Sequence, residues 1–367
     1  MSAARKLPLW ADIVVLPLLN LAVALLISGA IIRLIGESPL QAFRLMATGA
    51  FGAQDSIGYT LFYATDFIFT GLAVAVAFHA GLFNIGGEGQ AYIGGLGVGL
   101  VSLAFGSHSP WLVIPLGVAA ACIFGAAWAF VPAWLQARRG SHVVITTIMG
   151  NFIASALMTY LLVNVLIKPG QQSPETREFG PGAAMPAVHE VLGRLGIAFA
   201  PSPLNLTFLL ALAACVLVWA FIWRTRWGYA LRVVGHNPEA AMYAGISPAR
   251  FVIVSMVISG ALAGCLGVNE LMGSQHRILL DFPGGAGFVG IAVALMGRNH
   301  PVGIVAASLL FGALYQGGSQ LSFDMPHVNR DMVVLIQGLV ILLCGALENL
   351  FRAPLAALLG GRGKGRA

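Results

Sequence analysis

The sequence GLFNIGGEGQ, residues 81–90, decides how the rest of the chain is interpreted, because it separates two strongly apolar runs, residues 62–78 and 91–105. Four of its ten residues are glycine, and Asn84, Glu88 and Gln90 are polar. Glycine weakens helices and a carboxylate is costly in hydrocarbon, so we do not expect a stable lipid-facing helix here. Irregular backbone is tolerated at membrane depth only where protein or a water-filled cavity surrounds it. The stretch therefore predicts a broken helix that lines a passage.

The composition indicates an all-α polytopic membrane protein. Of the 367 residues, 58% are hydrophobic and only 9% are charged, which is too few charges to cover a soluble surface of this size. The formal net charge of +6 is spread over short loops, and this distribution favours membrane orientation over nucleic-acid binding. We predict no catalytic residue, no metal site and no cofactor.

Ten apolar runs predict about ten transmembrane helices in a single permease-like domain over residues 1–367. An orientation with both termini in the cytoplasm puts most of the Lys and Arg residues on that side. The runs are residues 13–32, 62–78, 91–105, 111–135, 143–167, 204–223, 251–272, 288–296, 302–315 and 332–351.

Two of the runs are unusually short, residues 91–105 and 288–296, and each follows a glycine-rich junction. The junctions are GGEGQ at residues 86–90 and PGGAG at residues 283–287. Under the proposed orientation, the two halves of the chain enter the membrane from opposite sides. This arrangement predicts two inverted repeats with paired broken helices and a substrate pathway at their interface.

One long polar segment, residues 168–203, is predicted outside the membrane on the extracytoplasmic side. It is too small for an enzyme domain. It could cover the pathway, receive an external partner, or simply connect two helices.

The cytoplasmic loop at residues 224–250 contains a short helix signal. Asn237 can act as the N-cap, Pro238 suits the first helical position, and Glu239 favours the positive end of a helix. Gly245 can end the helix in a left-handed conformation. We expect the loop to hold a short, isolated helix over residues 238–244, which is too short to be stable alone and therefore needs a packing partner. Lipid headgroups are an alternative partner, but we expect its exposed side to be largely alanine.

This helix carries the first part of a family resemblance. Glu239, Ala240 and Ala241, followed after three residues by Gly245, resemble the EAA-x3-G signature of ABC importer permeases, although residues 255–258 replace the I-x-L-P that follows it in that family. GLFNIGGEGQ, together with TGLAVA at residues 70–75 and GFVGIAVALMGRNHP at residues 287–301, is more specific. These motifs resemble the simple-sugar and nucleoside branch of the permeases that also serve branched-chain amino acids and ribose. The similarity extends over about residues 38–351.

The resemblance implies a passive membrane subunit in the bacterial plasma (inner) membrane. Its partners would be a second permease in a homodimer or heterodimer, two ATP-binding cassette subunits and an extracytoplasmic substrate-binding protein. The ATPases would dock at the cytoplasmic helix, and their closure would drive alternating access. The coupling residues implied are Asn237, Pro238, Glu239, Ala240, Ala241 and Gly245. The chain has no G-x4-G-K-[ST] motif, so we expect ATP hydrolysis in a separate subunit.

Five residues at the two junctions are candidates for the substrate pathway. Asn84, Glu88 and Gln90 could bond the hydroxyls of a ribose, while Phe83 and Phe288 could face a base. Alternatively, Glu88 caps the amides of a broken helix and Asn84 forms hydrogen bonds with nearby backbone groups.

Two carboxylates, Asp66 and Glu270, lie within apolar runs and are candidates for a pathway or for pairing with a basic residue across helices. We predict import of nucleosides, with a simple sugar such as a pentose as the alternative substrate. A stand-alone ion-coupled secondary transporter that uses Asp66 is the alternative class of protein.

Overall fold

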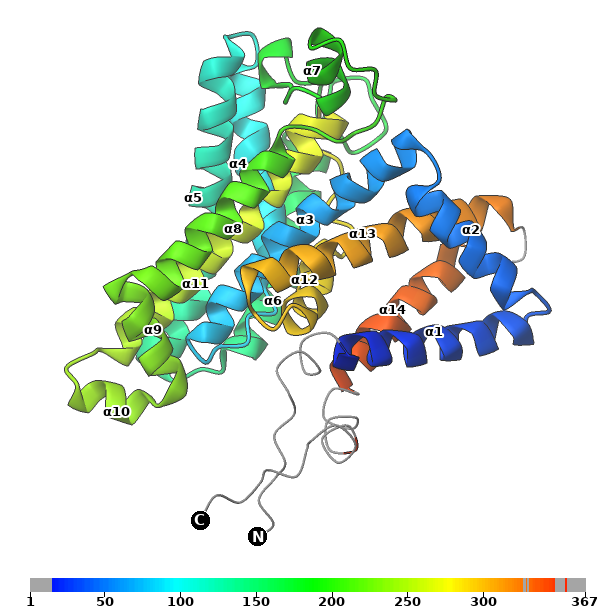
Figure 1. The fold of residues 1–367 in the computed structure, drawn as a ribbon. Coiled ribbons are helices and arrows are strands. Elements are labelled where there is room, and N and C mark those ends of the chain that lie inside the picture. The colour runs from blue at the N-terminus through cyan, green and yellow to red at the C-terminus, as the bar shows by residue number, and fades with distance from the viewer. Residues whose placement is uncertain (1–14, 326–327, 329, 347–353, 355–367) are drawn as a thin grey trace. The chain divides into compact units, whose positions relative to one another are not determined.

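The computed structural model describes residues 15–325, 328, 330–346 and 354, and its regular elements are helices (Figure 1). Two isolated β-bridges are the only strand-like pairings in the described part of the chain. The described chain forms two compact units, one of Met1–Gly49 with Gly317–Ala367 and one of Ala50–Gln316. The predicted all-α class is confirmed, while the single domain over residues 1–367 stays a prediction.

A helix lies at each of the ten predicted runs. Within the described residues, six helical segments are long and apolar enough to cross a membrane, and a seventh is obtained if α1 (Leu16–Leu34) and α2 (Pro39–Phe51), bent by 120°, form one span. Residues 13–14 and 347–351 of the predicted runs lie outside the described residues. The helices at these ten runs are α1 (Leu16–Leu34), α3 (Gln54–His79), α4 (Gly87–Phe105), α5 (Pro110–Arg139), α6 (Val143–Asn164), α8 (Thr207–Arg224), α11 (Pro248–Gly264), α12 (Ala286–Met296), α13 (Pro301–Asp324) and α14 (Arg330–Ala346).

Several helix boundaries differ from those of the apolar runs, and the differences at α4, α13 and α11 have a physical reason. α4 begins at Gly87, inside the glycine-rich stretch, because the amides of a first helical turn need no intrahelical partner and Glu88 favours that end. α13 continues to Asp324, past the apolar run, since its last turns carry polar side chains that the hydropathy pattern excluded. α11 ends at Gly264, and a π-helical segment, Val268–Gln275, begins inside the predicted run and extends three residues past its end. α12 has 11 residues and is too short to span a bilayer.

Helix packing in the larger unit depends on glycines that let backbones touch. A Cβ added to Gly125 of α5 would lie 2.1 Å from the Gly260 carbonyl oxygen of α11, and one added to Gly260 would lie 2.3 Å from the Gly125 oxygen. Small residues allow such close approach between membrane helices. α3 is largely buried along its length, so it forms the central helix of this unit.

The predicted extracytoplasmic segment is fixed to the end of the π-helical segment and includes a short helix, α7 (Val188–Arg194). The Phe179 amide donates to the His276 carbonyl at 2.7 Å, and the Thr176 amide donates to Ile278 at 3.1 Å. Arg277 pairs with Glu175 at 3.2 Å. These contacts show that the segment packs against the larger unit, and its three possible roles stay predictions.

Replacing Gly260 with alanine should destabilise the larger unit, because the new methyl group overlaps the Gly125 carbonyl. Overpacking of this kind typically costs about 1–3 kcal/mol. The thermal midpoint of the detergent-solubilised chain, followed by fluorescence-detected size exclusion, should fall. Gly338→Ala in α14 is the matched control, since its added Cβ meets nothing within 4 Å. Equal midpoints for the two variants would contradict the close contact.

Candidate functional site

The two glycine junctions predicted from the sequence meet in space. α3 ends at His79, Gly81 turns the chain with a φ of 74°, and the chain re-enters a helix at Gly87. In the second half, Gly285 has a φ of 85° and precedes α12. A Cβ on Gly287 would lie 2.2 Å from the Glu88 amide nitrogen, so the two backbones are in direct contact. No larger side chain fits at this position without moving one junction.

Glu88 fastens the first junction to the second. Its Oε1 accepts a hydrogen bond from the Gly285 amide at 2.9 Å, and its Oε2 accepts one from the Gly287 amide at 2.8 Å. These amides belong to the N-terminal end of α12, where no intrahelical acceptor exists and where the helix dipole favours an anion. Glu88 therefore caps the amides of a broken helix, which was the predicted alternative to a substrate contact. The helix that it caps, α12, lies in the other half of the chain.

Asn84 and Gln90 hold the first junction internally. Both side chains are buried, and Asn84 Nδ2 donates to Gln90 Oε1 at 2.9 Å and to Ser259 Oγ at 2.8 Å. Asn84 Oδ1 accepts from the Gly86 amide at 2.8 Å. Ser259 in turn donates to the Ala73 carbonyl at 2.6 Å, which joins α11 to α3. In this conformation the polar atoms of Asn84 and Gln90 are engaged within the chain.

Aromatic side chains gather beside this crossing. The rings of Tyr63 and Tyr315 lie 5.9 Å apart, and Phe67 packs edge-on against Tyr315 at 4.9 Å. Tyr315 is close enough to Glu88 for the two groups to interact electrostatically. Both tyrosines are partly exposed.

The two phenylalanines predicted for the pathway are not part of that cluster. Phe83 contacts Phe78, with ring centroids 5.3 Å apart. Phe288, the residue after Gly287, is 46% exposed. Sequence reasoning missed the two tyrosines because they lie far apart along the chain. A tyrosine in each of two apolar runs was the available signal.

The intramembrane carboxylates form a second connection between the halves. Asp66 of α3 is fully buried, and its Oδ1 accepts from Asn269 Nδ2 at 3.0 Å. Asn269 Oδ1 accepts from Asn205 at 3.0 Å, and Glu270 is hydrogen-bonded to Asp66. Asp66 and Glu270 therefore bond to each other, and Asp66 also bonds to Asn269, so the predicted pairing of each with a basic residue is wrong.

The short helix in the loop at residues 224–250 is present as α10 (Pro238–Tyr243). The Asn237 side chain accepts from the Glu239 and Ala240 amides, each at 3.0 Å, and Gly245 is left-handed with a φ of 75°. These contacts match the predicted cap and helix end.

Two expectations about this helix are wrong. α10 is not isolated, because α9 (Arg226–His236) precedes it directly and packs against it. Its exposed side is not largely alanine: Ala241 is buried, whereas Met242 is 59% and Tyr243 95% exposed. The six residues predicted to couple to an ATPase nevertheless surround this exposed apolar tip. α10 and α7 lie at opposite ends of the larger unit (Figure 1).

α9 connects the loop to the first junction. A Cβ on Gly235 would lie 2.2 Å from the His79 carbonyl oxygen, and one on Gly81 would lie 3.2 Å from the Gly235 oxygen. A continuous path of backbone contact therefore leads from α10 through α9 to the glycine-rich stretch and, by way of Glu88, to α12.

Membrane-spanning helices, touching broken-helix junctions and a capped surface helix together describe the membrane subunit of a transport system. Residues 56–345 match the family model described as "Branched-chain amino acid transport system / permease component". The chain belongs to this family, which confirms the resemblance drawn from its motifs.

Three relatives show how the family varies. The guanosine ABC transporter permease protein NupP of Bacillus subtilis is 36% identical over 85% of this chain and 88% of its own. The glucose ABC transporter permease protein TsgB13 of Haloferax volcanii is 34% identical over 92% and 88%. The guanosine ABC transporter permease protein NupQ, also of Bacillus subtilis, is 30% identical over 76% and 87%. No solved structure matches the chain.

Replacing Glu88 with alanine should loosen the N-terminal end of α12, because the Gly285 and Gly287 amides lose their acceptors. A hydrogen bond to a charged group contributes about 1.5–3 kcal/mol. Hydrogen exchange measured by mass spectrometry should show faster exchange over residues 283–290.

Glu190→Ala is the control for this variant, since Glu190 occupies the first turn of α7 and is exposed. Unchanged exchange at residues 283–290 in Glu88→Ala would show that Glu88 does not hold the second junction.

Proposed function

We propose that this chain is the permease subunit of an ATP-driven ABC importer and that its substrate is a nucleoside. The similarity to guanosine permeases over most of the chain is the observation that carries this proposal. The chain forms the substrate pathway and undergoes alternating access, while ATP is hydrolysed in separate subunits. The similarity to a glucose permease supports a simple sugar as the second candidate.

The substrate contacts Glu88, Tyr63, Tyr315 and Phe288 in the proposed pathway. Base stacking on aromatic rings contributes about 1–3 kcal/mol per base, and a carboxylate oxygen can accept from ribose hydroxyls. Phe83, Asn84 and Gln90 were also predicted for the pathway. Because Asn84 and Gln90 are bonded to each other, we assign them the role of positioning residues that keep the junction in place.

The partners are two ATP-binding cassette subunits, a second permease and an extracytoplasmic binding protein, in the bacterial inner membrane. The exposed Met242 and Tyr243 suit a hydrophobic groove on an ATPase, a mode of recognition in which a helix fills a groove. Asn237, Pro238, Glu239, Ala240, Ala241 and Gly245 keep α10 in the conformation that docks. Bacillus subtilis has two relatives of this chain that share a substrate name, which favours a heterodimer.

Movement is transmitted along the contacts that join the loop to the junctions. Displacement of α10 moves α9, and Gly235 then presses on the turn at Gly81 because no side chain separates them. Glu88 transfers the movement to α12 through two hydrogen bonds. Since α12 begins beside the aromatic cluster, its displacement changes access to the substrate.

The substrate assignment predicts a specific loss of guanosine uptake. In proteoliposomes that contain the assembled transporter and its binding protein, Tyr63→Ala and Tyr315→Ala should each raise the KM for guanosine about tenfold, the effect of losing one stacking contact. Tyr63→Phe and Tyr315→Phe should retain most of the affinity because the ring remains.

Tyr160→Ala is the matched control, because Tyr160 is 60% exposed on α6, away from the junctions. Saturable uptake of glucose with no uptake of guanosine by the wild-type complex would instead establish the sugar alternative. If both alanine variants had the wild-type KM for guanosine, the assignment of the two tyrosines to the pathway would be wrong.

The coupling assignment predicts that Glu239→Ala combined with Gly245→Val abolishes ATP-driven uptake and co-purification of the ATPase, while the chain still inserts into the membrane. Valine is strained at the φ of 75° of Gly245. Glu190→Ala combined with Gly36→Val is the control, because Gly36 also has a positive φ of 91° and open space around it. Normal uptake by the Glu239/Gly245 variant would defeat this assignment.

A further inference from the structure

Asn151 lies in the stripe of α6 that packs against α4. The buried residues of α6 recur every three or four positions, as on one face of a helix, and are Val143, Thr147, Ala154, Met158 and Leu162. Asn151 is half-buried within this stripe. The Thr147 hydroxyl donates to the Val143 carbonyl of its own helix, whereas the hydrogen-bond partners of Asn151 lie on another part of the chain. Asn151 therefore connects α6 to a neighbouring element.

That element is the first glycine junction, which Asn151 bonds at two points. Its Nδ2 donates to the Ile85 carbonyl at 3.0 Å, and its Oδ1 accepts from the Gly89 amide at 2.9 Å. α4 begins at Gly87, so the first bond lies before the start of that helix and the second lies in its first turn. Amides of a first turn have no acceptor within their own helix. One side chain therefore fixes the irregular segment and the start of α4 together.

The backbones of α6 and the first junction are in close contact at the same place. A Cβ on Gly89 would lie 2.9 Å from the Asn151 Cα and 3.2 Å from the Ala154 Cβ. One on Gly86 would lie 3.0 Å from the Thr147 Cβ. A side chain at Gly89 would therefore push α6 away and stretch both hydrogen bonds.

The two partners require a side chain that donates and accepts at once. A primary amide does so with its NH2 group and its carbonyl oxygen. An aspartate carboxylate only accepts, and at this position it would place negative charge against the Ile85 carbonyl. A protonated aspartic acid has one donor and one free acceptor, in nearly the shape of asparagine. Asn151→Asp is therefore expected to keep both bonds only while it is protonated.

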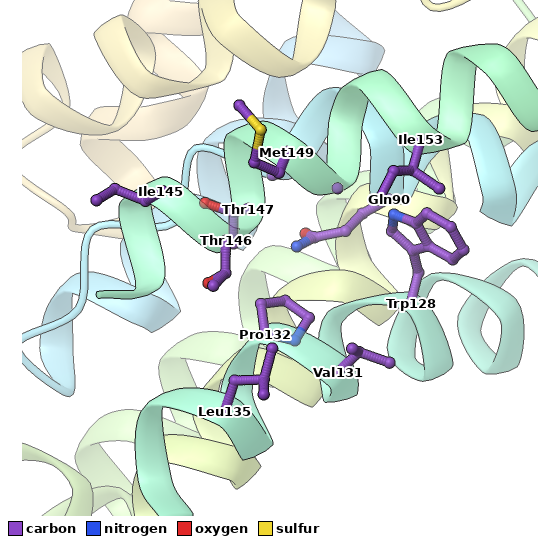
Figure 2. Close-up of a pocket in the computed structure, with 12 residues that line it drawn as sticks. Gln90, Trp128, Val131, Pro132, Leu135, Ile145, Thr146, Thr147, Met149 and Ile153 are labelled. Carbon is purple, nitrogen blue, oxygen red and sulfur yellow. The ribbon is translucent and has the colours of Figure 1, made fainter. Parts of the chain in front are cut away.

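Asn151 and Glu88 hold the first junction on two sides. Glu88 bonds it to α12, and Asn151 bonds it to α6. An apolar cavity of about 280 Å³ lies between α6 and α5. In Figure 2, side chains of α5 and α6 face one another across this cavity, and Gln90 of α4 reaches between them. Because α6 is bonded to the junction while α5 lies across the cavity, a movement of the junction carries α6 with it and changes the width of the cavity.

We propose that Asn151 is a positioning residue of the transport cycle, whose amide makes α6 move together with the first junction. This inference rests on the proposed function, in which α9 displaces the turn at Gly81 and thereby drives alternating access. Asn151 acts through the junction and does not contact the substrate. Its loss therefore lowers the rate at which the transporter changes conformation and leaves the affinity for the substrate in place.

Uptake by the assembled transporter in proteoliposomes tests this role. Asn151→Ala should lower the maximal rate of guanosine uptake about tenfold or more, since each of the two lost hydrogen bonds contributes roughly three- to tenfold. The KM for guanosine should stay within about twofold, because no contact with the substrate is removed. Asn164→Ala is the matched control on the same helix, since the exposed Asn164 donates to the Tyr160 carbonyl of α6 itself, and it should change neither value.

Asn151→Asp separates positioning from a general loss of folding. Its uptake rate, divided by that of the wild type at the same pH, should approach one near about pH 5 and fall as the pH rises towards about 8. The protonated acid forms both hydrogen bonds, whereas the carboxylate loses the bond to Ile85. The ratio to the wild type cancels the titration of Glu88 and of the partner proteins.

Hydrogen exchange of the purified full chain tests the contact without any transport. Asn151→Ala should speed exchange over residues 85–89, because the Gly89 amide loses its acceptor, and Asn164→Ala should not. If the wild-type complex took up no guanosine, the substrate assignment would be wrong, while the exchange result would still decide whether Asn151 holds the junction.

Three results would overturn the inference. The first is unchanged exchange over residues 85–89 in Asn151→Ala. The second is a raised KM for guanosine in that variant, which would place Asn151 in contact with the substrate instead. The third is an uptake rate of Asn151→Asp that stays as low as that of Asn151→Ala throughout the pH range. The aspartate variant keeps the test decisive even if Asn151→Ala fails to insert.

Discussion

The rest of the larger unit depends on the contact between Glu88 and the first amides of α12. A short helix that begins inside a membrane has amide groups that neither water nor its own turns can satisfy. Glu88 supplies both acceptors from the other half of the chain, at 2.9 and 2.8 Å. The two junctions therefore behave as one mechanical element, and glycine is required at Gly287 because the opposing backbone occupies the space of a side chain.

The same principle of direct backbone contact extends to the surface helix. α9 touches the turn at Gly81 through Gly235, and α5 touches α11 through Gly125 and Gly260. Contacts between backbones have no rotamers that could absorb a displacement, so a shift of one helix is passed on to its neighbour. The Asp66–Asn269–Asn205 network adds a second fixed connection, between α3 and the π-helical segment. This rigidity suits a subunit that moves in response to a separate motor.

The sequence was sufficient for features that depend on local chemistry. Ten apolar runs located ten helices, and Asn237, Pro238 and Gly245 predicted the limits of α10, because caps and left-handed glycines act within a few residues. Features that depend on pairing across the chain were not accessible. Nothing near Glu88 in the sequence indicates that its carboxylate accepts a hydrogen bond from the Gly285 amide. Likewise, nothing in the sequence indicates that the rings of Tyr63 and Tyr315 lie close together. α9 was missed because its polar and basic residues gave no apolar run, although it is strongly amphipathic.

The exposed tip of α10 has a consequence for how the protein is made. Tyr243 is 95% exposed and Met242 59%, side by side on a helix of six residues. A newly synthesised chain therefore exposes two neighbouring apolar side chains to water until another protein covers them. Exposed apolar side chains of this kind favour association with another protein surface, so overproduction of this chain alone is expected to favour self-association.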